Sequence, residues 1–190
     1  MSACFRGSEW RKWDLHIHSN ASDGHSSPSE IIGAAKEKEL SVIAITDHHT
    51  VKNIDKVKEL GSREGITVIS GIEFRTEYGS QSVHMIGLFP DKYNDINLTQ
   101  GALHDLILAK LGLSETAIIA KGKEVDPKLD NDAAFKTGMF RMQVDFKTEA
   151  ALIHSYGGIV TVHAGNKTNS IEEMKHDGPG KTNVNSLEDS

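Results

Sequence analysis

The chain lacks several features that would each have pointed to a particular class of protein. It has 190 residues and a single cysteine, Cys4, so it can form no internal disulfide bond. No apolar run is long enough to span a bilayer, and the N-terminus lacks the apolar segment of a signal peptide. No block rich in lysine and arginine occurs, and the formal net charge is −6. These absences argue against a membrane protein and a dedicated polyanion-binding surface. They predict a cytoplasmic protein, and they leave open a nucleotide or nucleic-acid substrate held by a metal.

What the sequence does contain is typical of one folded domain. Hydrophobic residues make up 37% and charged residues 25% of the chain, and 190 residues can bury a sizeable core. Apolar, strand-like runs alternate with amphipathic stretches, which predicts an α/β fold with mostly parallel strands. Five strands are few for a closed β/α barrel, so we expect an architecture that is incomplete at the C-terminus.

The expected elements follow from hydrophobic periodicity and from turn residues. The clearest helix start is Ser27-Pro28-Ser29-Glu30, which combines a capping box with proline at the first helical position. The segment 122–138 is polar and poorly patterned, so an inserted loop is expected there. We expect a domain over residues 1–165 and a polar, loosely ordered tail over 166–190. Trp10 and Trp13 are expected to pack at the N-terminal edge of the domain, the alternative being that they stack on a base. The expected strands are 15–18, 42–46, 66–74, 83–89 and 159–163, and the expected helices are 28–39, 51–64, 98–111 and 147–156.

Residues of the types that bind metals stand at or near the ends of these strands. His16 and His18 are two positions apart, so in a strand both imidazoles point to the same face. Parallel strands bring their C-terminal ends together, so ligands that are distant in the sequence converge there. Some of the candidate residues have an ordinary structural role as the alternative. His16 and His18 could be half-buried strand residues, Asp23 a turn residue, and His84 a core histidine. The candidate metal ligands are His16, His18, Asp23, His48, Glu73, His84 and His163.

This set of ligands exceeds what one tetrahedral metal site needs. It fits two or three divalent ions that share bridging ligands, an arrangement suited to phosphoester hydrolysis. Imidazole and carboxylate ligands without thiolates suit Zn, Mn or Fe and do not choose among them. We expect Asp47 to orient a ligand. Arg75 and Lys167 follow candidate ligands and could hold substrate phosphate, the alternative being solvated side chains.

Several motifs, taken in order, resemble those of the PHP (polymerase and histidinol phosphatase) family. That resemblance implies a distorted seven-stranded β/α barrel with a metal cluster at the C-terminal ends of the strands. It also implies hydrolysis of phosphoesters, or proofreading of DNA in members attached to bacterial polymerases. The motifs are Asp14-Leu15-His16-Ile17-His18 with Ser22-Asp23-Gly24, Thr46-Asp47-His48, Gly71-Ile72-Glu73, and Val162-His163-Ala164-Gly165.

The resemblance also suggests how the ligands are shared among ions. His16 and His18 match the first metal-binding pair, and Glu73 matches the carboxylate that bridges metals. Asp23 and His48 match ligands of a neighbouring ion. In the same way, His84 and His163 match ligands of a further ion.

One departure from the family pattern leaves two functions open. The late Asp-x-His motif of family members does not follow His163. The chain is expected to hydrolyse a phosphomonoester or phosphodiester by metal-activated water, the substrate being a phosphorylated small molecule or a nucleic acid. The alternative is a degenerate, non-catalytic metal-binding or regulatory module.

Residues 6–13 and 157–167 are similar to PHP domains fused ahead of a P-loop ATPase. No Gly-rich phosphate loop occurs here, so such an ATPase would lie beyond residue 190.

Overall fold

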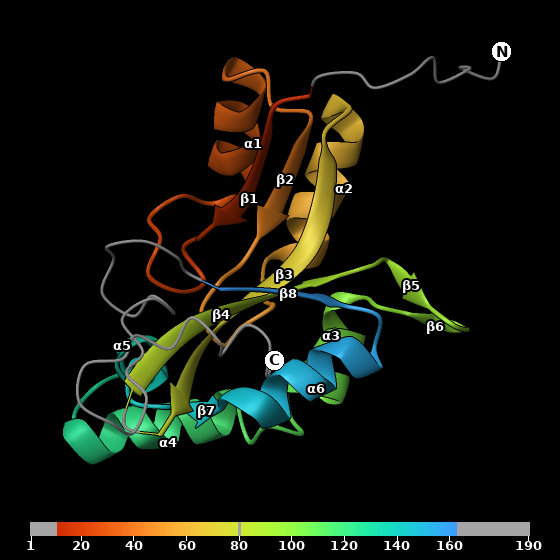
Figure 1. Cartoon of the computed structure of the whole chain (residues 1–190). Helices are drawn as coiled ribbons and strands as arrows, with labels where there is room; N and C mark the ends of the chain where they lie inside the picture. The colour runs from red at the N-terminus through yellow and green to blue at the C-terminus, as the bar shows by residue number, and fades with distance from the viewer. Residues whose placement is uncertain (1–10, 80, 163–190) are drawn as a thin grey trace, which may run out of the picture.

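The structure is a computed structural model that describes residues 11–79 and 81–162. Helices pack against a strongly curled sheet, and a small two-stranded ribbon projects at one side (Figure 1). The strands are β1 (Trp13–Ile17), β2 (Val42–Ile45), β3 (Thr67–Tyr78), β4 (Gln81–Phe89), β5 (Lys92–Tyr93), β6 (Ile96–Asn97), β7 (Val144–Asp145) and β8 (Ile159–Val162). The helices are α1 (Pro28–Glu37), α2 (Ile54–Glu64), α3 (Gln100–Leu103), the π-helix η1 (His104–Leu108), α4 (Glu115–Val125), α5 (Asn131–Met139) and α6 (Phe146–Ser155).

The main sheet changes strand direction in its middle. Its order is β1-β2-β3-β4-β8, and β7 pairs with the end of β3. The first three strands are parallel, whereas β4 is antiparallel to both β3 and β8. The prediction of mostly parallel strands is therefore wrong for β4, because β4 begins three residues after β3 ends, which leaves no room for a crossover helix. The α/β class is confirmed as a curled half-barrel.

The antiparallel pairing places the start of β4 beside the C-terminal end of β3. His84 pairs with Arg75, near the C-terminal end of β3. Val162, the last residue of β8, pairs with Met85 of β4, so β8 also ends at this edge. The predicted ligand His163 lies outside the described residues.

Local sequence signals account for the first βα unit. The predicted capping box forms: the Ser27 hydroxyl accepts from the Glu30 amide, and the Glu30 carboxylate accepts from the Ser27 amide at 2.7 Å. The next strand, β2, is buried along its whole length, as expected of a parallel strand covered on both faces. Helix α2 ends at Glu64 and is capped by Gly65, whose φ of 73° is the left-handed conformation that glycine adopts without strain.

The inserted loop predicted over 122–138 is wrong, because this segment belongs to a pair of packed helices. Ser114 and Asp130 cap the N-termini of α4 and α5 through their side chains. A Cβ added at Gly122 would lie 1.8 Å from the Ala134 carbonyl oxygen, and one at Gly138 would lie 1.9 Å from the Ile118 carbonyl oxygen. The two glycines are the contact points that let the helices approach each other, not helix breakers.

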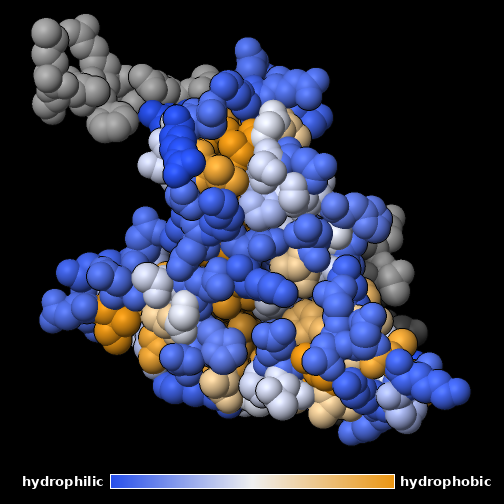
Figure 2. Space-filling view, turned by 180° about the vertical axis from the view of Figure 1, so that it is seen from behind, coloured by the Kyte–Doolittle hydropathy of each residue, from blue (hydrophilic) through white to orange (hydrophobic). Residues whose placement is uncertain are grey.

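The surface shows no single continuous apolar face in the view from behind, where hydrophobic residues form separate patches among hydrophilic ones (Figure 2). Trp13 was expected to pack at the N-terminal edge, but 58% of it is exposed at the start of β1, and Trp10 lies outside the described residues. None of the helices in the described ranges is long and apolar enough to cross a membrane.

A buried acid in α6 gives a prediction about stability. Glu149 is fully buried, and neither carboxylate oxygen has a hydrogen-bond partner among the described residues. Burial raises its pKa well above the ordinary 4.5, so the folded chain keeps a proton that the unfolded chain loses above pH 4.5. Stability therefore falls as the pH rises above that value. Glu149→Met is expected to raise the free energy of unfolding at neutral pH by about 1–3 kcal/mol.

Urea unfolding of parent and Glu149→Met at pH 5 and pH 8 checks this. The parent should lose stability relative to the variant between the two pH values. Equal stability of the two proteins at pH 8 would contradict the account. Glu59→Met makes the same substitution at an exposed position of α2 and serves as the control for replacing a glutamate that is not buried.

Candidate metal centre

The backbone pairing of β2 and β3 continues beyond the end of β2 and fixes the centre of the site. The Glu73 amide donates to the Asp47 carbonyl oxygen at 3.1 Å, and the His49 amide donates to the Glu73 carbonyl oxygen at 3.0 Å. Between these two bonds, His48 pairs with Glu73 across the sheet. The loop after β2 therefore lies directly beside the side chain of Glu73, which is only 1% exposed.

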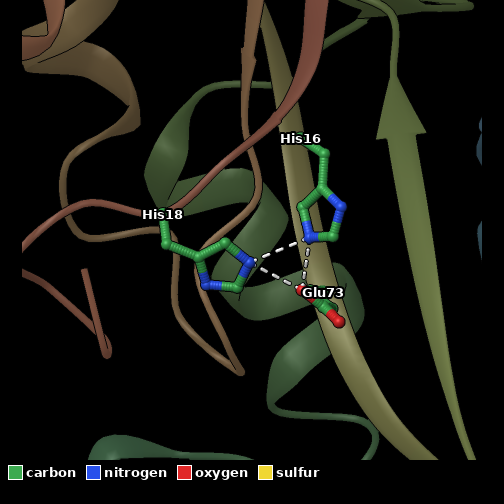
Figure 3. A group of neighbouring side chains, drawn as sticks. All are labelled: His16, His18 and Glu73. Carbon is green, nitrogen blue, oxygen red and sulfur yellow. Dashed lines mark hydrogen bonds and ion pairs between the residues drawn. The ribbon is translucent and has the colours of Figure 1, made fainter. Parts of the chain in front are cut away.

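The two histidines at the end of β1 point at this carboxylate, as Figure 3 shows. The Nε2 atoms of His16 and His18 each lie 2.7 Å from Glu73 Oε2 and 2.9 Å from each other. The register of β1 against β2 shifts between Asp14 and Ile17, an irregularity of the kind that re-aims side chains at the ends of strands. The predicted convergence of the histidine pair is thus present in the structure.

Three more of the predicted residues complete the cluster. His84 Nδ1 lies 2.7 Å from Glu73 Oε1, the carboxylate oxygen that does not face His16. Asp23 Oδ1 lies 2.7 Å from His18 Nδ1, and Asp23 Oδ2 lies 3.8 Å from His48 Nε2. The ligand atoms within each of three overlapping groups lie within 4.8 Å of one another; the groups are His16-His18-Glu73, His18-Asp23-His48 and His48-Glu73-His84.

The electrostatics of the cluster are those of a site that needs positive charge. Burial would raise the pKa of Glu73, but hydrogen bonds from His16, His18 and His84 hold it well below its usual range. Burial would lower the pKa of His18, but hydrogen bonds to Asp23 and Glu73 raise it to about 10. The hydrogen bond from His18 lowers the pKa of Asp23 to about 2. The cluster thus combines two ionised carboxylates with several imidazoles, and this set of donors fits divalent metal ions.

His48 and His49 have different environments although they are neighbours. Burial lowers the pKa of His48 to about 4, and its Nδ1 has no partner among the described residues. It is thus a neutral imidazole, the form that binds metals. Burial lowers the pKa of His49 to about 3, and its Nε2 donates to the Met142 carbonyl oxygen at 3.2 Å. His49 does not point into the cluster.

The carboxylate of Asp47 contacts the loop that carries Asp23, whereas its main-chain carbonyl oxygen accepts from the Glu73 amide. Its carboxylate accepts hydrogen bonds from the Ser19 amide at 2.7 Å, the Ser19 hydroxyl at 2.6 Å and the Ser22 hydroxyl at 2.5 Å. Burial raises the pKa of Asp47, and the hydrogen bonds from Ser19 and Ser22 oppose that rise. Asp47 therefore fixes the loop between β1 and α1 through these hydrogen bonds. The sequence showed these serines only as turn residues; the signal was a buried aspartate that needs donors.

Arg75 and Phe140 border the cluster on the side of α5. Arg75 Nη1 lies 3.3 Å from His84 Nε2, and its guanidinium carbon lies 5.6 Å from the centre of the Phe140 ring. The Phe140 ring lies 6.0 Å from the His48 ring, centre to centre. Sequence reasoning missed Phe140, because an isolated phenylalanine in a polar segment carries no pattern. Lys167, predicted to hold phosphate, lies outside the described residues.

A cavity of about 490 Å³ lies beside the same two loops. The loop after β1 contributes Asn20, and the loop after β2 contributes His49 and Lys52. Phe135 of α5 and Leu108 of η1 line it as well. Its volume is within the range of small-molecule sites.

Comparison with known proteins gives a consistent family. A 5′-3′ exoribonuclease of Haemophilus influenzae is 39% identical over 82 residues, which is 43% of this chain and 30% of that protein. A 3′,5′-nucleoside bisphosphate phosphatase of Chromobacterium violaceum is 35% identical over 75 residues, 40% of this chain and 26% of that protein. The matched regions thus span less than a third of the length of these curated relatives.

Solved structures agree on the fold. A candidate metal-dependent phosphoesterase from Bifidobacterium adolescentis superposes with a TM-score of 0.58 at 17% identity, covering 80% of this chain and 66% of that one. The model of the PHP domain matches residues 14–153, a range that runs from β1 into α6. With this match covering most of its length, the chain belongs to the PHP family.

Proposed function

We propose that the chain is a metal-dependent phosphoesterase whose centre is the carboxylate of Glu73. The observation that carries this proposal is the overlap of three ligand groups, two of which share Glu73, with His16 and His18 at its Oε2 and His84 at its Oε1. A carboxylate between two groups of imidazoles suits a cluster of two or three ions. The relatives named above are a phosphatase and an exoribonuclease, both of which act on phosphoester bonds.

We assign the ligands as the geometry groups them. His16 and His18 with Glu73 would hold one ion, and His48 and His84 with Glu73 would hold another, while Asp23 serves the ion next to His48 or orients His18. Bound divalent ions would polarise the phosphoryl oxygens and lower the pKa of a bound water. The chain itself contributes a closely spaced donor set, and Asp47 supports the loop that carries Asp23.

Arg75 is the described residue best placed to bind substrate phosphate. It is half-buried at the edge of the cluster, and Nε has no partner in the part of the chain that the structure describes. Burial lowers the pKa of Arg75, and the guanidinium stays a cation at neutral pH. Arg75→Ala is expected to raise KM for a phosphoester by roughly tenfold to a hundredfold with a smaller change in kcat. Steady-state kinetics beside Arg63→Ala, an exposed arginine of α2, would measure this; an unchanged KM would contradict it.

The test of the proposed function is hydrolysis of an aryl phosphate and an aryl phosphodiester with added Mn²⁺ or Zn²⁺. The parent chain should show turnover that a chelator abolishes and that His18→Ala removes. His154→Ala, an exposed histidine on α6, should keep the parent rate. Stoichiometric metal without turnover would reject the enzyme and favour the non-catalytic module. An ATPase domain beyond residue 190, a seven-stranded barrel and a cytoplasmic location stay predictions.

A further inference from the structure

Phe140 is an exposed aromatic residue at the rim of the proposed metal centre. It follows the last residue of α5 directly and is 43% exposed, whereas Phe74 and Phe146 are 2% exposed or less. Its ring lies beside the ring of His48, at an interplanar angle of 63°. The ring is exposed and lies beside a candidate metal ligand, so it is placed to contact a molecule bound at the metal centre.

The chain holds Phe140 in this position from both sides. On one side, Gly138 packs against the backbone of Ile118 in α4. On the other, the amides of Arg141 and Met142 donate to the Gly138 carbonyl oxygen, at 2.8 and 3.1 Å. The Met142 carbonyl oxygen in turn accepts from His49. The ring therefore sits on a turn whose backbone is anchored to α4 and to the loop after β2.

The chemistry around the ring selects a ligand class. The guanidinium carbon of Arg75 lies over one face of the ring at 5.6 Å, so a cation and an aromatic ring are in contact at the rim of the metal centre. A ligand that carries a phosphate and a flat heteroaromatic ring uses both features, because bases stack on aromatic side chains while cations bind phosphate. A net charge of −6 without a lysine- and arginine-rich block argues against contacts along a polynucleotide backbone.

Resting on the proposed function, we propose that Phe140 is a stacking residue for the nucleobase of a single nucleotide whose phosphate is bound at the metal centre. Phe140 thereby makes the site prefer nucleotides to phosphoesters that lack a base. Arg75 bridges the two parts of the ligand, since it lies between Phe140 and His84.

The test compares the binding of AMP and ribose 5-phosphate to the Mn²⁺-loaded chain by calorimetry. The two compounds share the phosphate and the sugar and differ in the base. The parent is expected to bind AMP between about fivefold and a hundredfold more tightly. Phe140→Ala should remove that preference by weakening AMP alone, and Phe140→Trp should keep it. Trp13→Ala, an exposed aromatic at the opposite end of β1, should behave as the parent.

The possible failures are distinguishable. Equal affinity of the parent for the two compounds, or a preference that survives in Phe140→Ala, would overturn the stacking role and leave the phosphoesterase proposal standing. A preference lost in Phe135→Ala but kept in Phe140→Ala would place the base in the cavity and also overturn it. Binding of neither compound would reject the phosphate site itself, and the stacking role with it.

Discussion

Glu73→Gln is expected to lower metal-dependent phosphoester hydrolysis by about a thousandfold or more and to remove most of the bound metal. The substitution keeps the shape of the side chain and removes its charge. Because Oε2 faces His16 and His18 while Oε1 faces His84, one change weakens two ligand groups at once. An amide also cannot offer two anionic oxygens to neighbouring ions. The expected loss is therefore larger than for a ligand that serves a single group.

Elemental analysis and steady-state rates of parent and Glu73→Gln measure this effect. Glu59→Gln changes an exposed glutamate of α2 in the same way and should match the parent in both readouts. Circular dichroism shows whether the variant folds, and His16→Ala gives a second test in case it does not. A Glu73→Gln protein that keeps its metal and more than a tenth of the parent rate would contradict the central role of this carboxylate.

Gly122→Ala is expected to destabilise the chain by about 3 kcal/mol, the upper end of what an overpacked contact costs. The added methyl carbon would lie 1.8 Å from the Ala134 carbonyl oxygen, and a backbone atom cannot move aside as a flexible side chain can. Helices α4 and α5 must separate to accept it. Because Phe140 follows α5 directly, its position beside His48 should change as well.

Urea unfolding tests this prediction, with Gly33→Ala as the matched control. Gly33 lies in α1, and a Cβ there would meet nothing within 4 Å. Gly33→Ala should therefore raise stability by about 0.5–1 kcal/mol, since alanine favours the helix. A Gly122→Ala protein as stable as the parent would show that the two helices do not approach through this glycine.

The sequence predicted the parts of the site that depend on local periodicity. The spacing of His16 and His18 and the ends of the first strands follow from side-chain alternation and from apolar runs, and six of the seven candidate ligands lie in the described part of the chain and meet there. His84 converges for a different reason from the predicted one. It lies near the start of an antiparallel strand, and strand direction depends on pairing that local patterns do not encode.

The errors have physical causes as well. The segment 122–138 lacked helical periodicity because Gly122 and Gly138 lie where two helices touch, and a small residue at such a contact looks like a helix breaker in the sequence. The contacts of Asp47 with Ser19 and Ser22, and of Phe140 with Arg75, join residues far apart in the chain. Only the folded structure brings them together.

Anomalous scattering from crystals of the parent chain grown with Mn²⁺ tests the central claim most directly. The account predicts at least two manganese peaks around Glu73, one close to Oε2 with His16 and His18 and another close to Oε1 with His84. The absence of any manganese peak at Glu73 would contradict it.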